Sequence, residues 1–442
     1  MHSSQRPQHI LILGYVWPEP RSSAAGSRMF ELIELFRAQH WQVIFASAAA
    51  LSEHRADLAA LEVEEKSIAL NCDSFDAFVA ALQPDLVLFD RFFTEEQFGW
   101  RVERACPTAL RVLDTVDLHC LRDARQRVLK GALADAGQSP NQCLLTLNTE
   151  LAELYAAMAD GDMAQREVAA IYRSDLTLLL SPFEMQLLQQ QFGVPAALLQ
   201  HCPLMGIQAL TDSPAFAQRE HFVSIGNFRH APNWDAVLCL KQQLWPLIRQ
   251  RLPKAQLHIY GAYPPPKATA LHNPKQGFHV LGWADDAHRV MSGARVCLAP
   301  LRFGAGIKGK LADAMVCGTP SVTTPIGSEG MHGDLPWGGA VVQTAAEFAE
   351  AAVALYANPD LWQQAQDAGA QILAEQFAAT QLHRQLLKRL LEAQRHLQRN
   401  RQRNFVGSML RHHLHKSSQY LSQWIAAKNQ EPVARITPQP SL

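Results

Sequence analysis

The stretch with the clearest chemical potential is PLRFGAGIKGKLADAMVCGTPSVTTPIGSEGM, at residues 300–331. It follows an apolar run typical of a buried strand, and we expect its short helix, at 310–317, to end before Gly318. Glycines leave backbone N–H groups uncovered, and a helix start adds partial positive charge. Lys308 and Lys310 supply full charges. The stretch therefore predicts a cradle for a diphosphate, built around Gly304, Gly306 and Gly309.

A carboxylate and a second glycine loop accompany this cradle. Asp313 lies one turn inside the expected helix, where it could accept hydrogen bonds from vicinal hydroxyls such as those of a ribose. The second loop, PIGSEGM, contains Gly327, Glu329 and Gly330. A single glycine loop would be read more simply as a flexible loop with solvated lysines. The joint occurrence of both loops, the lysines and the carboxylate favours a binding site.

The elements that must position these residues alternate along the whole chain. In the first half, apolar runs begin at positions 9, 41, 85, 109 and 175, and in the second half at 221, 255, 278, 294 and 320. Continuous apolar strands separated by helical patterns indicate parallel sheets that are covered on both faces. We expect an α/β protein with two doubly wound domains, at 1–205 and 217–378, then a basic helical tail at 379–428 and disorder at 429–442.

Open parallel sheets bind ligands at the carboxyl ends of their strands. The loop after the first strand, residues 14–30, contains Gly14 and Gly26 but no G-x-G-x-x-G, which disfavours a site for NAD. Its run SSAAGS still suits close approach of a ligand to backbone N–H groups, with Gly26, Ser27 and Arg28 as candidate contacts. A plain loop with Ser27 as the helix N-cap fits the sequence equally well.

Composition excludes several classes of protein. The 442 residues contain 40 Lys and Arg against 41 Asp and Glu, so overall charge does not point to nucleic acid as a partner. Eight cysteines without a C-x-x-C pair argue against a zinc site or a disulfide framework and fit a reducing compartment. No apolar run is long enough for a signal peptide or a membrane span. We therefore expect a cytoplasmic protein.

Residues 300–331 resemble the donor-nucleotide motif of GT-B fold glycosyltransferases, in the glycogen-synthase-like, mostly retaining group. FVSIGNFRHAPNWDAV, from Phe222, and GWADDAHRVMSGARVCLAPL, from Gly282, resemble two further segments of that family's nucleotide-binding domain. The likeness is strong over 222–373 and weak in the first half. It implies a GT-B fold, with two Rossmann-like domains facing across a cleft. It also implies a nucleotide-diphosphate sugar as donor and no cofactor or metal, because lysines and a helix dipole do the work of a divalent ion.

The resemblance also assigns roles to single residues. Lys308 would help to stabilise the departing diphosphate, and Arg229 takes the place of a phosphate-binding arginine, although its usual lysine partner is not visible. The family commonly has two glutamates eight positions apart around the loop, where this chain has Ala305 and Asp313. The candidate substrate contacts are Gly26, Ser27, Arg28, Asn227, Arg229, Gly304, Ala305, Gly306, Ile307, Lys310, Asp313, Gly327, Glu329 and Gly330.

In the first half, the stretch at 111–125 places Asp114, Asp117 and His119 after a strand. The family has a histidine in such a loop that faces the sugar, and His119 best matches it, with Asp117 near enough to orient its imidazole. These two residues and Lys308 are therefore the candidate catalytic groups. The alternative is a histidine that is satisfied by local hydrogen bonds.

A second loop of the first half, FDRFFTEEQFGWRV at 89–102, also follows a strand. Its aromatic side chains could stack on a sugar or glycan acceptor. A helix that packs Phe92, Phe98 and Trp100 inward explains the pattern as well, and we favour this core interpretation.

The tail changes in character. Between positions 383 and 416, nine Lys and Arg face a single acidic residue, Glu392, and leucines recur at helical spacing. One interpretation is a terminal helix packed back on the first domain. Another is a basic amphipathic contact with an anionic membrane or an acidic partner. Both can hold, with packing to about Leu391 and the basic surface beyond it.

Together with these patterns, the resemblance implies a retaining glycosyltransferase that uses a nucleotide sugar and a glycan, lipid-linked or protein acceptor. It would be cytoplasmic or peripheral on the inner face of the membrane. The alternatives are a nucleotide-sugar epimerase on the same fold and a non-catalytic sugar-nucleotide-binding partner subunit.

Overall fold

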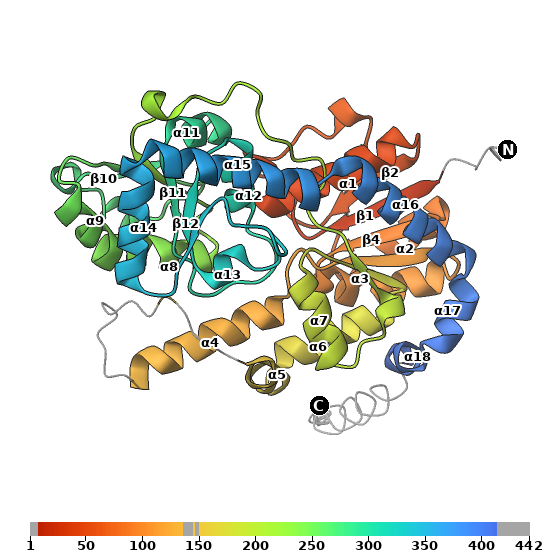
Figure 1. Cartoon of the computed structure of the whole chain (residues 1–442). Coiled ribbons are helices and arrows are strands. Elements are labelled where there is room, and N and C mark those ends of the chain that lie inside the picture. The colour runs from red at the N-terminus through yellow and green to blue at the C-terminus, as the bar shows by residue number, and fades with distance from the viewer. Residues whose placement is uncertain (1–7, 136–144, 146–149, 413–442) are drawn as a thin grey trace, which may run out of the picture.

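The computed structural model describes residues 8–135, 145 and 150–412, so the end of the tail, at 413–428, and the segment expected to be disordered, at 429–442, lie outside the described residues (Figure 1). The first sheet has seven parallel strands in the order β3-β2-β1-β4-β5-β6-β7. These strands are β1 (His9–Gly14), β2 (Gln42–Ser47), β3 (Glu64–Ser67), β4 (Leu86–Asp90), β5 (Leu110–Asp114), β6 (Leu176–Leu179) and β7 (Leu199–His201). The helices between and after them are α1 (Ala24–Ala38), α2 (Ser74–Leu82), α3 (Phe92–Ala105), α4 (His119–Asp135), α5 (Leu151–Ala159), α6 (Asp162–Arg173) and α7 (Pro182–Gln190).

The second sheet has six parallel strands in the order β10-β9-β8-β11-β12-β13. They are β8 (Phe222–Ile225), β9 (Leu257–Tyr260), β10 (Phe278–Gly282), β11 (Val296–Ala299), β12 (Ser321–Thr323) and β13 (Gly339–Val341). The α-helices of this half are α8 (Ala231–Cys239), α9 (Trp245–Arg251), α10 (Pro266–Thr269), α11 (Ala287–Gly293), α12 (Gly309–Val316), α13 (Pro325–Ser328), α14 (Ala345–Ala357) and α15 (Pro359–Gln376). The expected pair of doubly wound parallel sheets is confirmed.

The first sheet is apolar on both faces because helices cover both. Along β1, alternate residues point to opposite sides, as the period of a strand requires. Ile10 and Ile12 join a buried cluster with residues of α1, whereas Leu11 and Leu13 join a cluster with residues of α3 and α4. Figure 1 shows α1 on one side of the sheet and α3, α6 and α7 on the other.

The chain returns to the first sheet after the second one. Helix α16 (Ala379–Arg395) runs back beside α1 (Figure 1). Its Leu386, Leu390 and Ala393 are buried in the same apolar cluster as Ile10 of β1, and Leu397 of the next helix joins them. The expected packing of the tail on the first domain is therefore confirmed, and it extends beyond Leu391.

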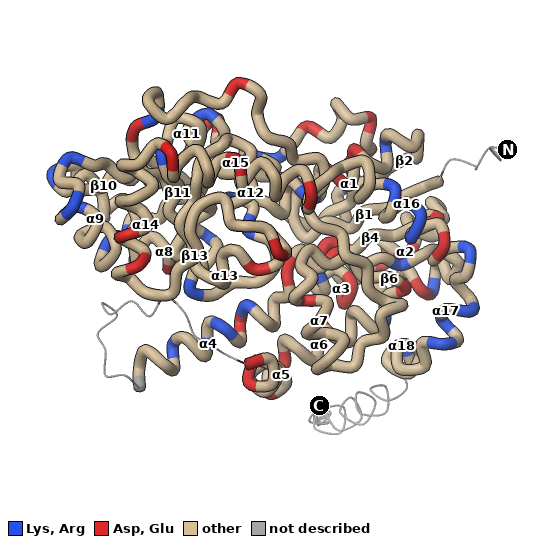
Figure 2. The backbone as a smooth tube through the Cα atoms, in the orientation of Figure 1, with Lys and Arg blue, Asp and Glu red and all other residues tan. Residues whose placement is uncertain are grey.

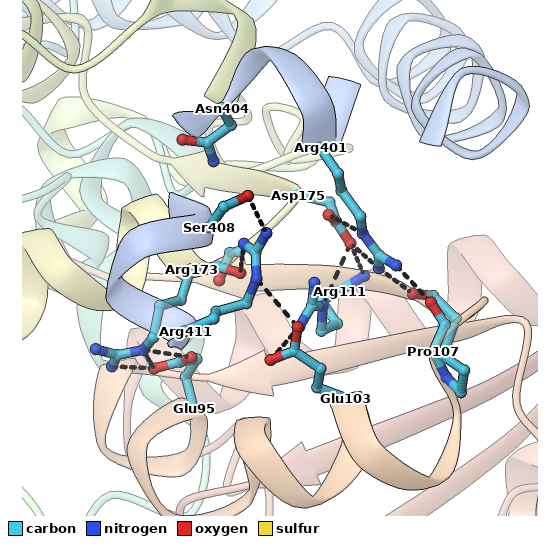
Figure 3. A network of polar contacts seen from close by, with 12 residues as sticks. Glu95, Glu103, Pro107, Arg111, Arg173, Asp175, Arg401, Asn404, Ser408 and Arg411 are labelled. Atoms are coloured by element: carbon cyan, nitrogen blue, oxygen red, sulfur yellow. Dashed lines mark hydrogen bonds and ion pairs between the residues drawn. The ribbon is translucent and has the colours of Figure 1, made fainter. Parts of the chain in front are cut away.

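The basic residues beyond α16 do not form one free surface. Helices α17 (Leu397–Arg403) and α18 (Phe405–Arg411) lie against the first domain through a polar network (Figure 3). Arg401 binds both carboxylate oxygens of Asp175 at 2.7 Å and also donates to the carbonyls of Pro107 and Ala109. Arg411 pairs with Glu103 at 3.1 Å. Two of the cations expected to face a membrane or a partner are instead structural.

Two further observations bear on the composition. Cys239, on α8, is disulfide-bonded, which the expectation of reduced, singly scattered cysteines did not foresee. No helix among the described residues is long and apolar enough to cross a membrane.

Arg401→Ala should lower the free energy of unfolding by about 3 kcal/mol, because it leaves the carboxylate of Asp175 buried without this partner. Asp175 resists ionisation through burial, but Arg401 and Arg111 together hold its pKa below the ordinary value. The loss should therefore shrink as the pH falls below the usual range of an aspartate, where protonation removes the pair.

Urea unfolding of full-length variants measures this effect. Arg399→Ala is the matched control, since Arg399 is exposed on the same helix, and its variant should stay within about 0.5 kcal/mol of the parent protein. Equal stability of the two variants would mean that the network in Figure 3 does not hold the tail.

Candidate active site between the two sheets

The loop that follows β5 carries Asp117 and His119, and its geometry is fixed from the neighbouring helix α6. Both carboxylate oxygens of Glu167 accept backbone N–H groups at the start of α4, from His119 at 3.1 Å and from Cys120 at 2.8 Å. The Nδ1 atom of His119 lies 3.1 Å from the carbonyl of Asp117 and 3.6 Å from a carboxylate oxygen of both Asp117 and Glu167. These contacts orient the imidazole of His119, which is mostly buried.

Asp117 is an ionised carboxylate in a nearly closed environment. Burial opposes its ionisation, but Arg122, together with His119 and His230, holds its pKa well below the ordinary value. Arg122 forms an ion pair with it from the next turn of α4. His230 comes from the second domain, just before α8, so residues of both domains act on this carboxylate.

The glycine loop of the second domain lies directly against this histidine loop. Gly306 has a φ of 63°, and a Cβ atom at this position would lie 2.9 Å from Cβ of Asp117. The backbone N–H of Gly306 donates to Oε1 of Glu184 at 2.8 Å, and the same oxygen accepts from Leu118 at 3.0 Å. The two stretches that the sequence singled out therefore meet. The N–H of Gly306, however, is not uncovered as expected, because Glu184 already binds it.

A second set of contacts holds both glycine loops to the first domain. Arg125 of α4 donates to the carbonyl of Gly304 at 2.8 Å and binds both oxygens of Glu329, at 3.0 and 2.7 Å. Gly330 has a φ of 74°, and a Cβ atom there would come within 2.6 Å of Oγ of Ser181. Gly304, Glu329 and Gly330 were all predicted to contact substrate, and the structure puts them at the contact between the domains.

The two lysines of the cradle occupy different surroundings. Lys308 is buried; burial lowers its pKa, while Glu329 and Glu184 act in the opposite direction. Its Nζ atom donates to the carbonyl of Gly306 at 2.5 Å. Lys310 donates to Asn233 at 2.6 Å, and burial lowers its pKa to about 8. Neither lysine is a solvated surface cation.

The loop after β8 contacts the first domain through aromatic side chains. The guanidinium of Arg229 lies 3.6 Å from the ring centre of Tyr263, whose hydroxyl donates to Glu19 of the first domain at 3.0 Å. The rings of His54 and Trp283 stack at 3.9 Å. Within the second domain, Nδ2 of Asn233 donates to the carbonyl of Asn227, which links this loop to Lys310.

Asp313 keeps an accessible carboxylate on α12. Its side chain is 43% exposed and lies 3.6 Å from Nε2 of His288. The hydrogen bond to Asp313 is the main cause that raises the pKa of His288. The carboxylate of Asp313, which was predicted to contact substrate, is therefore accessible to a ligand.

Several predicted contacts need correction. Arg28 is fully buried, where its Nε lies 2.9 Å from both carboxylate oxygens of Asp114 and its Nη1 donates to the carbonyl of Cys202. It supports the core and cannot reach a substrate as placed. The side chains of Ala305 and Ile307 belong to buried apolar clusters that include first-domain residues, so only their backbone is left for a ligand.

The first loop also differs in detail. Ser23, not Ser27, caps α1, by accepting the N–H of Gly26 at 3.1 Å. The hydroxyl of Ser27 donates to the carbonyl of Pro20. A Cβ atom on Gly26 would lie 2.3 Å from the backbone of Glu19, so this glycine serves a close turn. At the start of α13, the backbone N–H of Gly327 donates to the hydroxyl of Thr324, which caps the helix.

The core interpretation of the stretch at 89–102 is confirmed for two of its three aromatic residues. Phe92 and Phe98 are buried, but Trp100 is exposed and lies beside the guanidinium groups of Arg101 and Arg104. Glu95 is buried against Arg173.

The sequence did not single out the side chains that hold these loops in place, mainly Arg122, Arg125, Glu167 and Glu184. Glu184 follows β6 at the carboxyl edge of the first sheet, so the rule that ligands bind at that edge could have found it. Glu167 lies within α6 and has no such signal. No group of three or more His, Cys, Asp or Glu side chains among the described residues is arranged to hold a metal ion.

Comparison with known proteins gives the fold a name. Residues 219–358 match the family model described as Glycosyl transferases group 1, whereas no curated protein matches the chain. The structure is similar to sucrose-phosphate synthase from Thermosynechococcus elongatus, with a TM-score of 0.61, 16% identity, and coverage of 87% of this chain and 99% of that chain. It is also similar to Anabaena HepE in complex with UDP and glucose, with a TM-score of 0.60, 13% identity, and coverage of 87% of this chain and 99% of that chain. A third similar structure is a glycosyltransferase from Rickettsia africae, with a TM-score of 0.61, 11% identity, and coverage of 88% of this chain and 99% of that chain.

At these identities the solved structures show the fold, and the family model identifies the second domain. The expected resemblance is therefore confirmed at two levels: the chain has the GT-B fold, and its residues 219–358 match the group 1 glycosyltransferase family model.

Proposed function

We propose that this glycosyltransferase uses a nucleoside-diphosphate sugar and transfers its sugar, with retention, to a hydroxyl of a glycan, a lipid-linked sugar or a protein. The observation that carries the proposal is the direct contact of the lysine-bearing glycine loop with the loop of Asp117 and His119. A donor held at the first loop would present its sugar to the second. The solved complex of HepE with UDP and glucose supports UDP as the first nucleotide to test.

The donor would be held by charges of the second domain. Asp313 has the exposure to accept hydrogen bonds from ribose hydroxyls. Lys308 and Lys310 offer cations beside the loop, and Arg229 offers another after β8. We propose that these cations, and not a metal, stabilise the diphosphate as the bond between it and the sugar breaks.

His119 would act on the sugar. In the transfer, the bond between the anomeric carbon and the diphosphate oxygen breaks, a bond to the acceptor oxygen forms, and the acceptor loses its proton. Charge develops on the sugar and on the diphosphate in the transition state, so a fixed hydrogen-bonding group is more useful there than a mobile one. The carbonyl of Asp117 orients the imidazole in this way, and Glu167 holds the backbone N–H of His119.

One measurement tests this activity: release of UDP from UDP-glucose and other UDP-sugars, with and without acceptor sugars. A transferase releases UDP when an acceptor is present. An epimerase would convert the donor without releasing UDP, and a non-catalytic partner subunit would bind the donor unchanged. Failure to bind or use any nucleotide sugar would contradict the proposal.

Two substitutions separate binding from chemistry. Asp313→Asn should raise the donor KM by about tenfold with little change in kcat, because a ribose contact is present in both ground and transition states. His119→Ala should lower kcat by about 100-fold with a smaller effect on KM. Steady-state kinetics with the donor varied at saturating acceptor measures both. A near-normal kcat for His119→Ala would remove His119 from the catalytic groups.

We further propose that the protein binds the cytoplasmic face of an anionic membrane through α18. One side of this helix is fastened to α6: Asn404 donates to the carbonyl of Tyr172 at 2.8 Å, and Gly407 packs against the same carbonyl. Four other side chains on the helix are exposed, namely Phe405 (74%), Val406 (39%), Met409 (46%) and Leu410 (38%).

Basic residues accompany this apolar surface. Figure 2 shows Lys and Arg following one another along α16 and α17. Arg395, Arg399 and Arg403 are exposed, in contrast to Arg401 and Arg411. Apolar side chains that insert at the interface, beside cations that face anionic headgroups, are the two signals of peripheral membrane binding.

Sedimentation with vesicles that contain anionic lipid tests this surface. The double variant Phe405→Ser/Met409→Ser should bind at least about tenfold more weakly than the parent protein, since two apolar side chains lose their burial. Leu361→Ser, which removes a 39% exposed apolar residue from α15, should bind normally. Absence of binding by the parent protein, or equal binding by both variants, would contradict the proposal.

A further inference from the structure

Glu184 is a buried carboxylate that joins the two domains. It lies in the first turn of α7 and has no exposed surface. Its Oε1 atom accepts two backbone N–H groups, from Leu118 in the histidine loop at 3.0 Å and from Gly306 in the glycine loop at 2.8 Å. Leu118 and Gly306 belong to different domains, so a single oxygen connects the two loops.

The other oxygen of this carboxylate is unused. Oε2 is buried and has no hydrogen-bond partner among the described residues. A buried carboxylate with an unsatisfied oxygen is expensive for folding, and an apolar residue at this position would avoid that cost. The contacts of Oε1 therefore suggest a role that an apolar side chain could not fill.

We propose that Glu184 is a positioning residue for glycosyl transfer, in that its carboxylate joins the loop of Asp117 and His119 to the glycine loop and so sets the position of His119 relative to the donor. The inference rests on the proposed function. Two N–H groups bound to one oxygen cannot move apart without losing a hydrogen bond. Loss of the carboxylate should thus loosen the joint between the loops without removing any group expected to hold the nucleotide.

The charges around Glu184 make its bonds dependent on pH. The facing groups are Asp117, Cys120 and Arg122 from the loop after β5 and from α4, and Lys308 from the glycine loop. Burial is the main cause that raises the pKa of Glu184 to about 7; Asp117 adds to the rise and Lys308 opposes it. The ionised form is the stronger acceptor, so the joint should tighten as the pH rises through about 7.

Hydrogen exchange measures the joint without reference to activity. Glu184→Gln retains size and an acceptor oxygen but removes the charge. At pH 8, it should speed the exchange of the backbone amides of both Leu118 and Gly306 by roughly tenfold, the factor for a loss of about 1.4 kcal/mol. Glu95→Gln is the matched control: it alters another buried carboxylate of the first domain, paired with Arg173, and should leave both amides protected.

Kinetics then tests the role in catalysis. Glu184→Gln should lower kcat by about tenfold and change the donor KM by less than about threefold. It should also remove the rise in activity near pH 7, which the parent protein and Glu95→Gln should both retain. Glu184→Asp, which keeps the charge on a shorter side chain, should retain that rise in activity. A Glu184→Gln variant that binds UDP but cannot be distinguished from the parent protein in kcat and pH profile would overturn the inference.

The exchange result keeps this inference distinct from the proposed function. Unchanged protection of either amide in Glu184→Gln would overturn the joint even if the parent protein transfers sugar. Faster exchange of both amides in a protein that uses no nucleotide sugar would contradict the proposed function, and would overturn the positioning role while leaving the joint itself in place.

Discussion

The arrangement of the site depends on how closely the glycine loop approaches the first domain. A Cβ atom at Gly306 would lie 2.9 Å from Cβ of Asp117 and 3.1 Å from the carbonyl of Val116, and the φ of 63° is itself unfavourable for other residues. Only the missing side chain lets the two loops touch. Each loop follows a strand, β5 in one sheet and β11 in the other, so the contact is made by the edges at which parallel sheets bind ligands.

The same contact between the loops brings several charged side chains together in a buried environment. Arg125 pairs with Glu329, Arg122 with Asp117, and Lys308 lies near the carboxylates of Glu184 and Glu329. Buried ion pairs add little stability relative to apolar packing, because desolvation offsets most of their attraction. An arrangement of this kind is better explained by the binding of a charged ligand. The pKa shifts agree with that explanation, since Asp117 stays ionised while burial disfavours the charged forms of Lys308 and Glu184.

The sequence could predict the two parallel sheets and the two loops of the site, but not the side chains that hold these loops in place. Strands such as β1 and β4 are continuous apolar runs, whereas β3, β7 and β13 contain no such run, so the sequence does not predict them. Arg28 directly follows the small-residue run SSAAGS, which predicts close approach of a ligand; its burial against Asp114 is instead set by tertiary packing. Glu184 and Arg125 have meaning only once the two domains face each other, and no local pattern contains that information.

The path of the chain explains how such a site could open for a substrate. The chain passes between the domains twice, near Gly206 and near Phe377, and the N–H of Gly206 donates to the carbonyl of Phe377 at 3.4 Å. Because the two crossings lie side by side, a relative rotation of the domains can bend both at one place. The contacts that resist such a rotation on the site side include those of Glu184, Arg125 and Tyr263 and the stacked rings of His54 and Trp283. Glu184 and Arg125 join the glycine loop to the first domain, so a rotation that admits a donor must break their hydrogen bonds and closure must form them again.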